Sequence, residues 1–100
     1  MITSQNREKL CHFVASKIIG YEIAFTRDGE VVTKDSERRW AIMPRNMLMN
    51  VLRNDLKQNF KELQSNKEIN KLLSIIIKNF IELAQETEEG EYHDVQHKLS

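Results

Sequence analysis

The sequence predicts a mostly helical α+β domain in which a helix and a β-hairpin precede two long antiparallel helices. Apolar residues recur every three or four positions in three segments, which is the spacing of an amphipathic helix. Between the first two segments, apolar and polar residues alternate around an Asp-Gly pair, which is a strong hairpin signal. The expected elements are a helix over 4–19, a hairpin over 21–34, and helices over 44–64 and 66–88.

The first predicted helix has a start signal, an apolar stripe and a stop signal. Thr3 or Ser4 can accept hydrogen bonds from the free N–H groups of the first turn. Gly20 is expected to end the helix in a left-handed conformation, which costs glycine nothing because it has no Cβ. The stripe expected to face the core comprises Leu10, Cys11, Val14, Ile18 and Ile19.

The predicted hairpin turns at Asp28 and Gly29, a pair that favours a two-residue type I′ turn. Such a turn places Phe25 opposite Val32. The face expected to pack on helices then comprises Tyr21, Ile23, Phe25 and Val32. A two-stranded hairpin is marginally stable alone, so we expect a third strand, either from residues 38–42 or from a partner.

The two long helices also carry boundary signals. Pro44 suits the first helical position, where its missing N–H leaves no bond unmade. Ser65 and Glu68 have the spacing of a capping box at the start of the last helix. The short link between the helices predicts an antiparallel αα-hairpin. The expected core stripes comprise Leu48, Leu52, Leu56, Phe60 and Leu63 in one helix, and Ile69, Leu72, Leu73, Ile76, Phe80, Leu83 and Ala84 in the other.

Length and charge indicate one ordinary globular domain. The 100 residues allow a globular unit over 1–90 and a polar, flexible tail over 91–100. Fifteen basic and fifteen acidic side chains cancel, so the whole chain has no net attraction to nucleic acid or membrane. The single cysteine excludes an internal disulfide, and no apolar run is long enough for a signal peptide or membrane span. We therefore expect a cytoplasmic protein.

No residue pattern predicts catalysis, a metal or a cofactor. Cys11 and His12 are adjacent on a helix, so their side chains point about 100° apart and do not face each other. His93 and His97 could share an ion on a helix, but two ligands make a weak site. An active site assembled from scattered residues such as His12, Tyr21 and Glu22 is the remaining enzymatic alternative. We expect a protein that is not an enzyme.

Surplus apolar surface predicts association with protein. Three residues of the last helix lie outside its main stripe, and methionine and tryptophan, which are enriched in interfaces, gather near residue 40. We expect a regulatory, adaptor or inhibitor protein that acts through apolar helix surface as a homo-oligomer, most simply a homodimer. The expected interface comprises Trp40, Met43, Met47, Ile75, Ile77 and Ile81. The alternative is that these side chains form the chain's own core.

A nucleic-acid-binding regulator is the second hypothesis. Arginine forks bind phosphates, and an aromatic ring can stack on an exposed base. The expected patch comprises Arg38, Arg39, Trp40, Arg45, Arg53 and Lys57. Between Lys34 and Lys57, six basic and three acidic side chains leave a net charge of only +3. Nucleic-acid-binding domains are usually more basic, so protein association is the favoured hypothesis.

Overall fold

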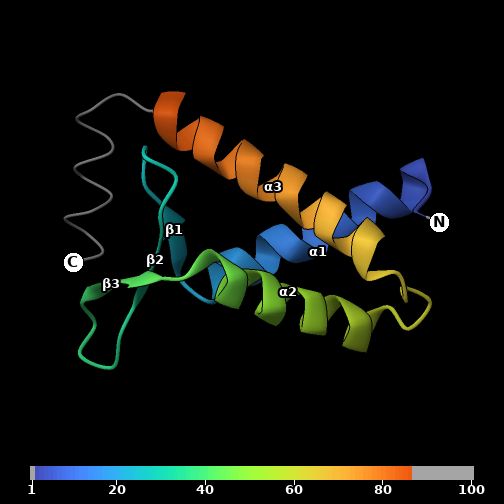
Figure 1. Cartoon of the computed structure of the whole chain (residues 1–100), viewed down its shortest axis with the longest axis horizontal. Helices are drawn as coiled ribbons and strands as arrows, with labels where there is room; N and C mark the ends of the chain where they lie inside the picture. Colours follow the sequence, from blue (N-terminus) through green and yellow to red (C-terminus); the bar gives the residue numbers. More distant parts are fainter. Residues whose placement is uncertain (1, 87–100) are drawn as a thin grey trace.

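A computed structural model describes residues 2–86 of the chain. Its elements, in chain order, are α1 (Ser4–Gly20), β1 (Ile23–Phe25), β2 (Val31–Lys34), β3 (Trp40–Met43), α2 (Arg45–Asn59) and α3 (Asn66–Glu86). The strands lie at one end of the molecule, and the three helices extend away from them (Figure 1). The predicted class, a mostly helical α+β fold, is confirmed.

The three strands form an antiparallel sheet in the order β1-β2-β3. β2 is therefore the central strand, paired with β1 on one side and with β3 on the other. The third strand expected near residues 38–42 comes from this chain rather than from a partner, because Trp40–Met43 pairs with Val31–Lys34. A third strand gives the hairpin the additional backbone hydrogen bonds and apolar contacts that a two-stranded ribbon lacks.

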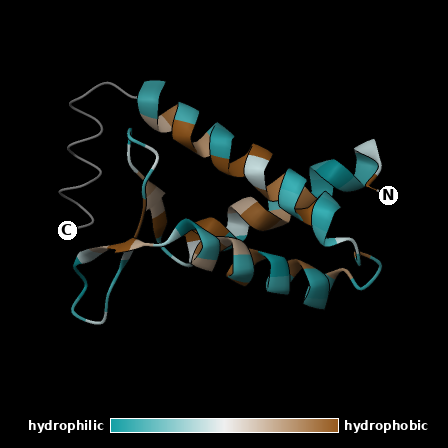
Figure 2. Cartoon of the chain, in the orientation of Figure 1, coloured by the Kyte–Doolittle hydropathy of each residue, from teal (hydrophilic) through white to brown (hydrophobic). Residues whose placement is uncertain are grey.

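The core lies where the three helices meet one another and one end of the sheet. The apolar faces of the helices point into the space between them (Figure 2). Two aromatic pairs extend the core: Phe13 with Phe60 at 5.2 Å and Phe25 with Phe80 at 5.4 Å between ring centroids. Its buried members are Leu10, Val14, Ile18, Phe25, Val31, Leu48, Leu52, Leu56, Leu63, Ile69, Leu72, Leu73, Ile76 and Ile77.

Two of the predicted helix caps are present. The Thr3 hydroxyl accepts from the Asn6 N–H at 3.3 Å, and the Ser65 hydroxyl accepts from the Glu68 N–H at 3.3 Å. Pro44 is the cap residue that precedes α2 rather than its first helical residue, and no side chain caps this helix. The first N–H groups of α2 therefore lack the side-chain acceptor that the other two helices have.

The predicted end of the second helix was wrong by five residues. α2 stops at Asn59 because Phe60 leaves the helical region, with φ −131° and ψ 81°. The Phe60 ring packs edge-on against Phe13 of α1, and Leu63 is buried from within the linker. Tertiary contacts of these two apolar residues thus replace the helical turn that periodicity predicted.

The predicted register of the first hairpin was also wrong. Phe25 faces Val31, not Val32, because the loop contains three residues rather than two. In this loop Gly29 has a positive φ of 87°, whereas Asp28 does not have the positive φ that a type I′ turn requires. The shift by one residue moves Val31 to the core, where it is 2% exposed, and Val32 to the other face.

The end of the first helix differs from its prediction as well. Gly20 lies within α1, and the left-handed residue that follows is Glu22, with φ 56°. Ile19, expected in the core stripe, is 70% exposed, since it points about 100° away from the buried Ile18.

Three predictions lie outside the described residues. They are the last two residues of the helix expected over 66–88, the predicted tail 91–100 and the histidine pair.

Candidate functional site

The face of the sheet that points away from the core carries a row of apolar side chains. Residues opposite each other in an antiparallel sheet share a face, and neighbours along a strand alternate between faces. Phe25, Val31 and Met43 face the core and contact it. The residues between them along the strands therefore lie on the opposite face. This outer sheet face comprises Ala24, Val32 and Ile42 in one row and Lys34 and Trp40 in the next.

Ile42 is the most exposed residue of the outer sheet face. Its side chain is 70% exposed, whereas its row neighbours Ala24 and Val32 are half-buried. Trp40 is half-buried beside Lys34, whose ammonium lies 6.0 Å from the centroid of the indole ring. The Trp40 indole N–H is buried and has no hydrogen-bond partner among the described residues. No outer-face residue belongs to the core cluster formed by the described residues.

The edge of β3 has backbone groups that no described strand uses. The Asp35 N–H donates to the Arg39 carbonyl at 2.8 Å, which makes these two residues a hydrogen-bonded pair of the β2–β3 ladder. Bonded and non-bonded pairs alternate along an antiparallel ladder. Ala41 and Met43 therefore bond to β2, and Trp40 and Ile42 direct their N–H and C=O groups to the outer edge.

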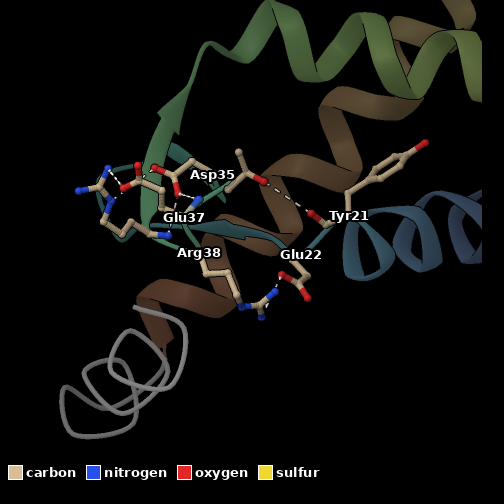
Figure 3. A network of polar contacts seen from close by, with 7 residues as sticks. Tyr21, Glu22, Asp35, Glu37 and Arg38 are labelled. Atoms are coloured by element: carbon tan, nitrogen blue, oxygen red, sulfur yellow. Dashed lines mark hydrogen bonds and ion pairs between the residues drawn. The ribbon is translucent and has the colours of Figure 1, made fainter.

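A polar network closes the loop between β2 and β3 (Figure 3). The Asp35 carboxylate accepts from the N–H groups of Arg39 and Glu37, both at 2.9 Å. The hydrogen bond from Arg39, aided by the one from Glu37 and by the Arg39 charge, holds the pKa of Asp35 below its ordinary value. Arg38 takes a left-handed conformation, with φ 61°, and its side chain points toward Glu22, which lies 3.9 Å away. The loop is thus a constrained element at the end of β3.

The arginines of the predicted nucleic-acid patch have separate partners within the chain. Arg39 pairs with Glu37 at 2.5 Å and with Asp35 at 3.7 Å. Arg45 donates to the Gly29 carbonyl at 2.9 Å and so ties α2 to the first hairpin loop. On the helical side, Arg53 donates to the amide oxygens of Asn50 and Asn70, and Lys57 is half-buried.

The predicted apolar helix interface is largely used inside the chain. Ile77 is 2% exposed and is a core residue, so its assignment to an interface was wrong: α1, α2 and β1 all contact α3 and leave this residue almost no exposed surface. Ile75 and Ile81 are half-buried, and Ile81 packs against the core. Met43 also packs against the core, and Met47 is 51% exposed. Of the residues in the predicted interface, Trp40 is the one that lies on the outer sheet face.

The interface predicted from the sequence did not include Ile42, Val32 and Ala24. The signal for Ile42 is the alternation in Trp40-Ala41-Ile42-Met43, which places Trp40 and Ile42 on one face of a strand. The signal for Val32 depends on the hairpin register, which shifts it to the outer side. These residues therefore emerge as one surface only when all three strands are paired.

The other chemical candidates do not form a site. Cys11 is half-buried at the margin of the core. The Tyr21 hydroxyl donates to the Asp55 carboxylate at 2.5 Å, and this bond, with burial and the Asp55 charge, raises the pKa of Tyr21. Within residues 2–86, no three His, Cys, Asp or Glu side chains come together as potential metal ligands.

Comparison of the chain with protein-family models, curated proteins and solved structures gives no match in any of the three. Across residues 2–86, none of the helices has the length and apolar content needed to cross a membrane. The outer sheet face and the β3 edge are the features of the described residues that bear on function.

Proposed function

We propose that this chain is a non-catalytic protein-binding module of the regulatory, adaptor or inhibitor kind, which contacts its partner through the outer sheet face. The observation that supports this proposal is the 70% exposure of Ile42 in a row with Val32 and Ala24, beside Trp40. This surface takes the place of the apolar helix surface expected from the sequence. The single cysteine is consistent with a cytoplasmic location, which we retain as part of the proposal.

Covering this face supplies a driving force for association. Full burial of an isoleucine side chain stabilises by about 1.5–3 kcal/mol relative to leaving it in water. Tryptophan is a frequent anchor of protein interfaces, where polar residues form the rim. Here Arg38 and Arg39 lie in the loop that leads into β3, so charged groups border the apolar row.

The arginines give less support to nucleic-acid binding. Arg39 already faces two carboxylates, and Arg38 lies near a third. An arginine paired with a carboxylate must lose that contact before it can neutralise a phosphate, which reduces the gain from counterion release. Arg45 and Arg53 are likewise engaged with groups of the same chain.

A matched pair of substitutions tests the proposed surface. Ile42 and Ile19 are both 70% exposed, but Ile42 lies on the outer sheet face and Ile19 in the last turn of α1. Tagged wild-type, Ile42→Lys and Ile19→Lys chains are used to recover bound protein from the native cell, with nuclease present, and quantified by mass spectrometry. We expect Ile42→Lys to reduce the recovered partner at least about tenfold, which corresponds to about 1.4 kcal/mol. Equal recovery by all three chains would contradict the proposal.

A further inference from the structure

We propose that the partner is a second copy of this chain, joined through the edge of β3 that no described strand pairs with, so that two three-stranded sheets become one six-stranded antiparallel sheet. This inference rests on the proposed function, because it assigns an occupant to the same surface. Its starting point is the position of β3 at the end of the sheet order β1-β2-β3. An edge strand with unused N–H and C=O groups is a template for pairing with another strand.

The backbone of β3 is complementary to itself in one register. Trp40 and Ile42 both direct their N–H and C=O groups outward, as the alternation of the β2–β3 ladder requires. A two-fold axis at Ala41 places Trp40 of each copy opposite Ile42 of the other. Both pairs are then hydrogen-bonded, and every outward backbone group of the two residues obtains a partner. A strand whose outward N–H and C=O groups belong to two residues on either side of a central one can pair with a second copy of itself about a two-fold axis, so that both copies use the same surface.

The same register also joins the apolar side chains. Paired residues share a face, so Trp40 of one copy lies next to Ile42 of the other on the outer side. The row formed by Ala24, Val32 and Ile42 then continues into Trp40 of the second copy. The most exposed residue of the outer sheet face thereby gains an aromatic neighbour on the side where one copy alone leaves it open.

Charge complementarity favours a second copy over an unrelated strand. In this antiparallel arrangement, the β2–β3 loop of each copy lies beside the first turn of α2 in the other. That turn has neither a side-chain cap nor an acidic residue, and it begins with Arg45. The loop contributes Glu37, whose side chain is 67% exposed and pairs with Arg39 of the same loop. In the dimer its carboxylate would also lie near the positive end of the helix, where an acidic group is favourable. The contact occurs twice because the axis is two-fold.

A cysteine on the axis tests this geometry directly. Ala41 would face its own copy in a non-hydrogen-bonded pair, where Cα atoms are about 4.5 Å apart, within the range of disulfides. Ala41→Cys in a Cys11→Ser background is oxidised with glutathione disulfide, and the product is separated without reductant. We expect a disulfide-linked dimer to form at least about ten times faster than from the control Ile19→Cys in the same background, because Ile19 is also exposed but lies in α1, outside the proposed pair of β3 strands.

Sedimentation equilibrium supplies the second measurement. The wild-type chain is expected at twice its mass of 11.8 kDa. Ile42→Pro is expected to be monomeric with an unchanged circular dichroism spectrum, because proline at this position removes an outward N–H and leaves the bonds to β2 intact. A dimer that resists Ile42→Pro and does not cross-link at residue 41 would overturn the inference.

The outcomes separate this inference from the proposed function. A chain that stays monomeric and does not cross-link at residue 41 is not joined as proposed. If that monomer still recovers a different cellular protein, and Ile42→Lys abolishes the recovery, the outer sheet face binds protein but its occupant is not a second copy. If neither association is found, both the inference and the proposed function fail.

Discussion

Gly29 and Arg38 occupy the same position in two hairpin loops of the same geometry. Each is the last of three loop residues, with φ 87° for Gly29 and φ 61° for Arg38, and each donates its N–H to the carbonyl of the residue that opens the loop. That opening residue, Thr26 or Asp35, also accepts with its side chain from the N–H of the residue that closes the loop. The sheet therefore uses one loop design twice, with glycine at the left-handed position in the first loop and arginine in the second.

Arg38→Gly is expected to stabilise the fold. A non-glycine residue in the left-handed region destabilises the fold by about 1–2 kcal/mol, and glycine removes this strain. Part of that stabilisation is lost again, because glycine has more conformational freedom in the unfolded chain. We expect the free energy of unfolding in urea to rise by about 0.5–1 kcal/mol. Glu37→Gly is the matched control: its φ is not positive, so it is expected to lower the free energy of unfolding. A lower free energy of unfolding for Arg38→Gly than for the wild type would contradict the claim that Arg38 is strained in the left-handed conformation.

Gly29→Ala is expected to destabilise the fold by about 1 kcal/mol. A Cβ at this position would lie 3.6 Å from the Arg45 guanidinium and 3.7 Å from Ile81, which are ordinary contacts. The expected cost therefore comes from the positive φ and not from crowding. Urea unfolding measures it, and Gly20→Ala, within α1 and with no atom near the added Cβ, is expected to stabilise instead. Equal effects at the two glycines would contradict this explanation.

The bond from Tyr21 to Asp55 is expected to make stability fall at alkaline pH. It joins Tyr21, the cap residue that follows α1, to α2, and it raises the pKa of Tyr21 above 10.0 because the protonated hydroxyl is the donor. Since the pKa is higher in the folded chain, the contribution is complete below about pH 10 and is lost as pH rises through the folded pKa.

Thermal unfolding of wild type and Tyr21→Phe checks this prediction. At about pH 8 the variant is expected to be less stable by about 1 kcal/mol, the usual net value of one hydrogen bond. The difference in melting temperature should begin to shrink above about pH 10, where the tyrosine ionises in the unfolded chain, and should vanish once the pH exceeds the raised folded pKa. A constant difference across this range would show that the hydroxyl contributes nothing through Asp55.

Ile77→Ala and Ile42→Ala are expected to differ sharply in their effect on the free energy of unfolding. Ile77 is 2% exposed, and truncating a buried isoleucine costs about 2–5 kcal/mol through lost burial and the cavity left behind. Ile42 is 70% exposed, and an exposed substitution stays within about 0.5 kcal/mol. The comparison is made in urea with the chain too dilute to associate. Similar costs at both positions would contradict the assignment of Ile77 to the core and Ile42 to the surface.

The helices were predictable because their signals are local. A hydroxyl at Thr3 or Ser65 contacts an N–H only three residues away, so the sequence alone indicates both starts. The buried stripes of α1 and α2 follow from the geometry of 3.6 residues per turn. The end of α2 was not predictable in this way, because Phe60 leaves the helix to contact Phe13, which is distant in the sequence.

The candidate surface was only partly predictable. Trp40 was selected from its residue type, but Ile42 and Val32 share its face only through the register of two hairpins. That register depends on whether a loop has two or three residues, and Asp28-Gly29 is compatible with both. A shift of the strand register by one residue moves every side chain of that strand to the opposite face of the sheet. The ambiguity in the length of one loop therefore decides which residues form the surface.

By itself, the sequence determined the fold class, the order of the elements and the helix starts, because each depends on periodicity and on bonds between near neighbours. Only the tertiary structure decided which apolar residues are covered. Ile77 and Ile42 are chemically identical side chains, and one is buried while the other is 70% exposed because distant helices cover α3 but no core residue covers the outer side of β3 in the part of the chain described. The different burial of these two residues is a property of the assembled elements, and the local pattern around each of them does not encode it.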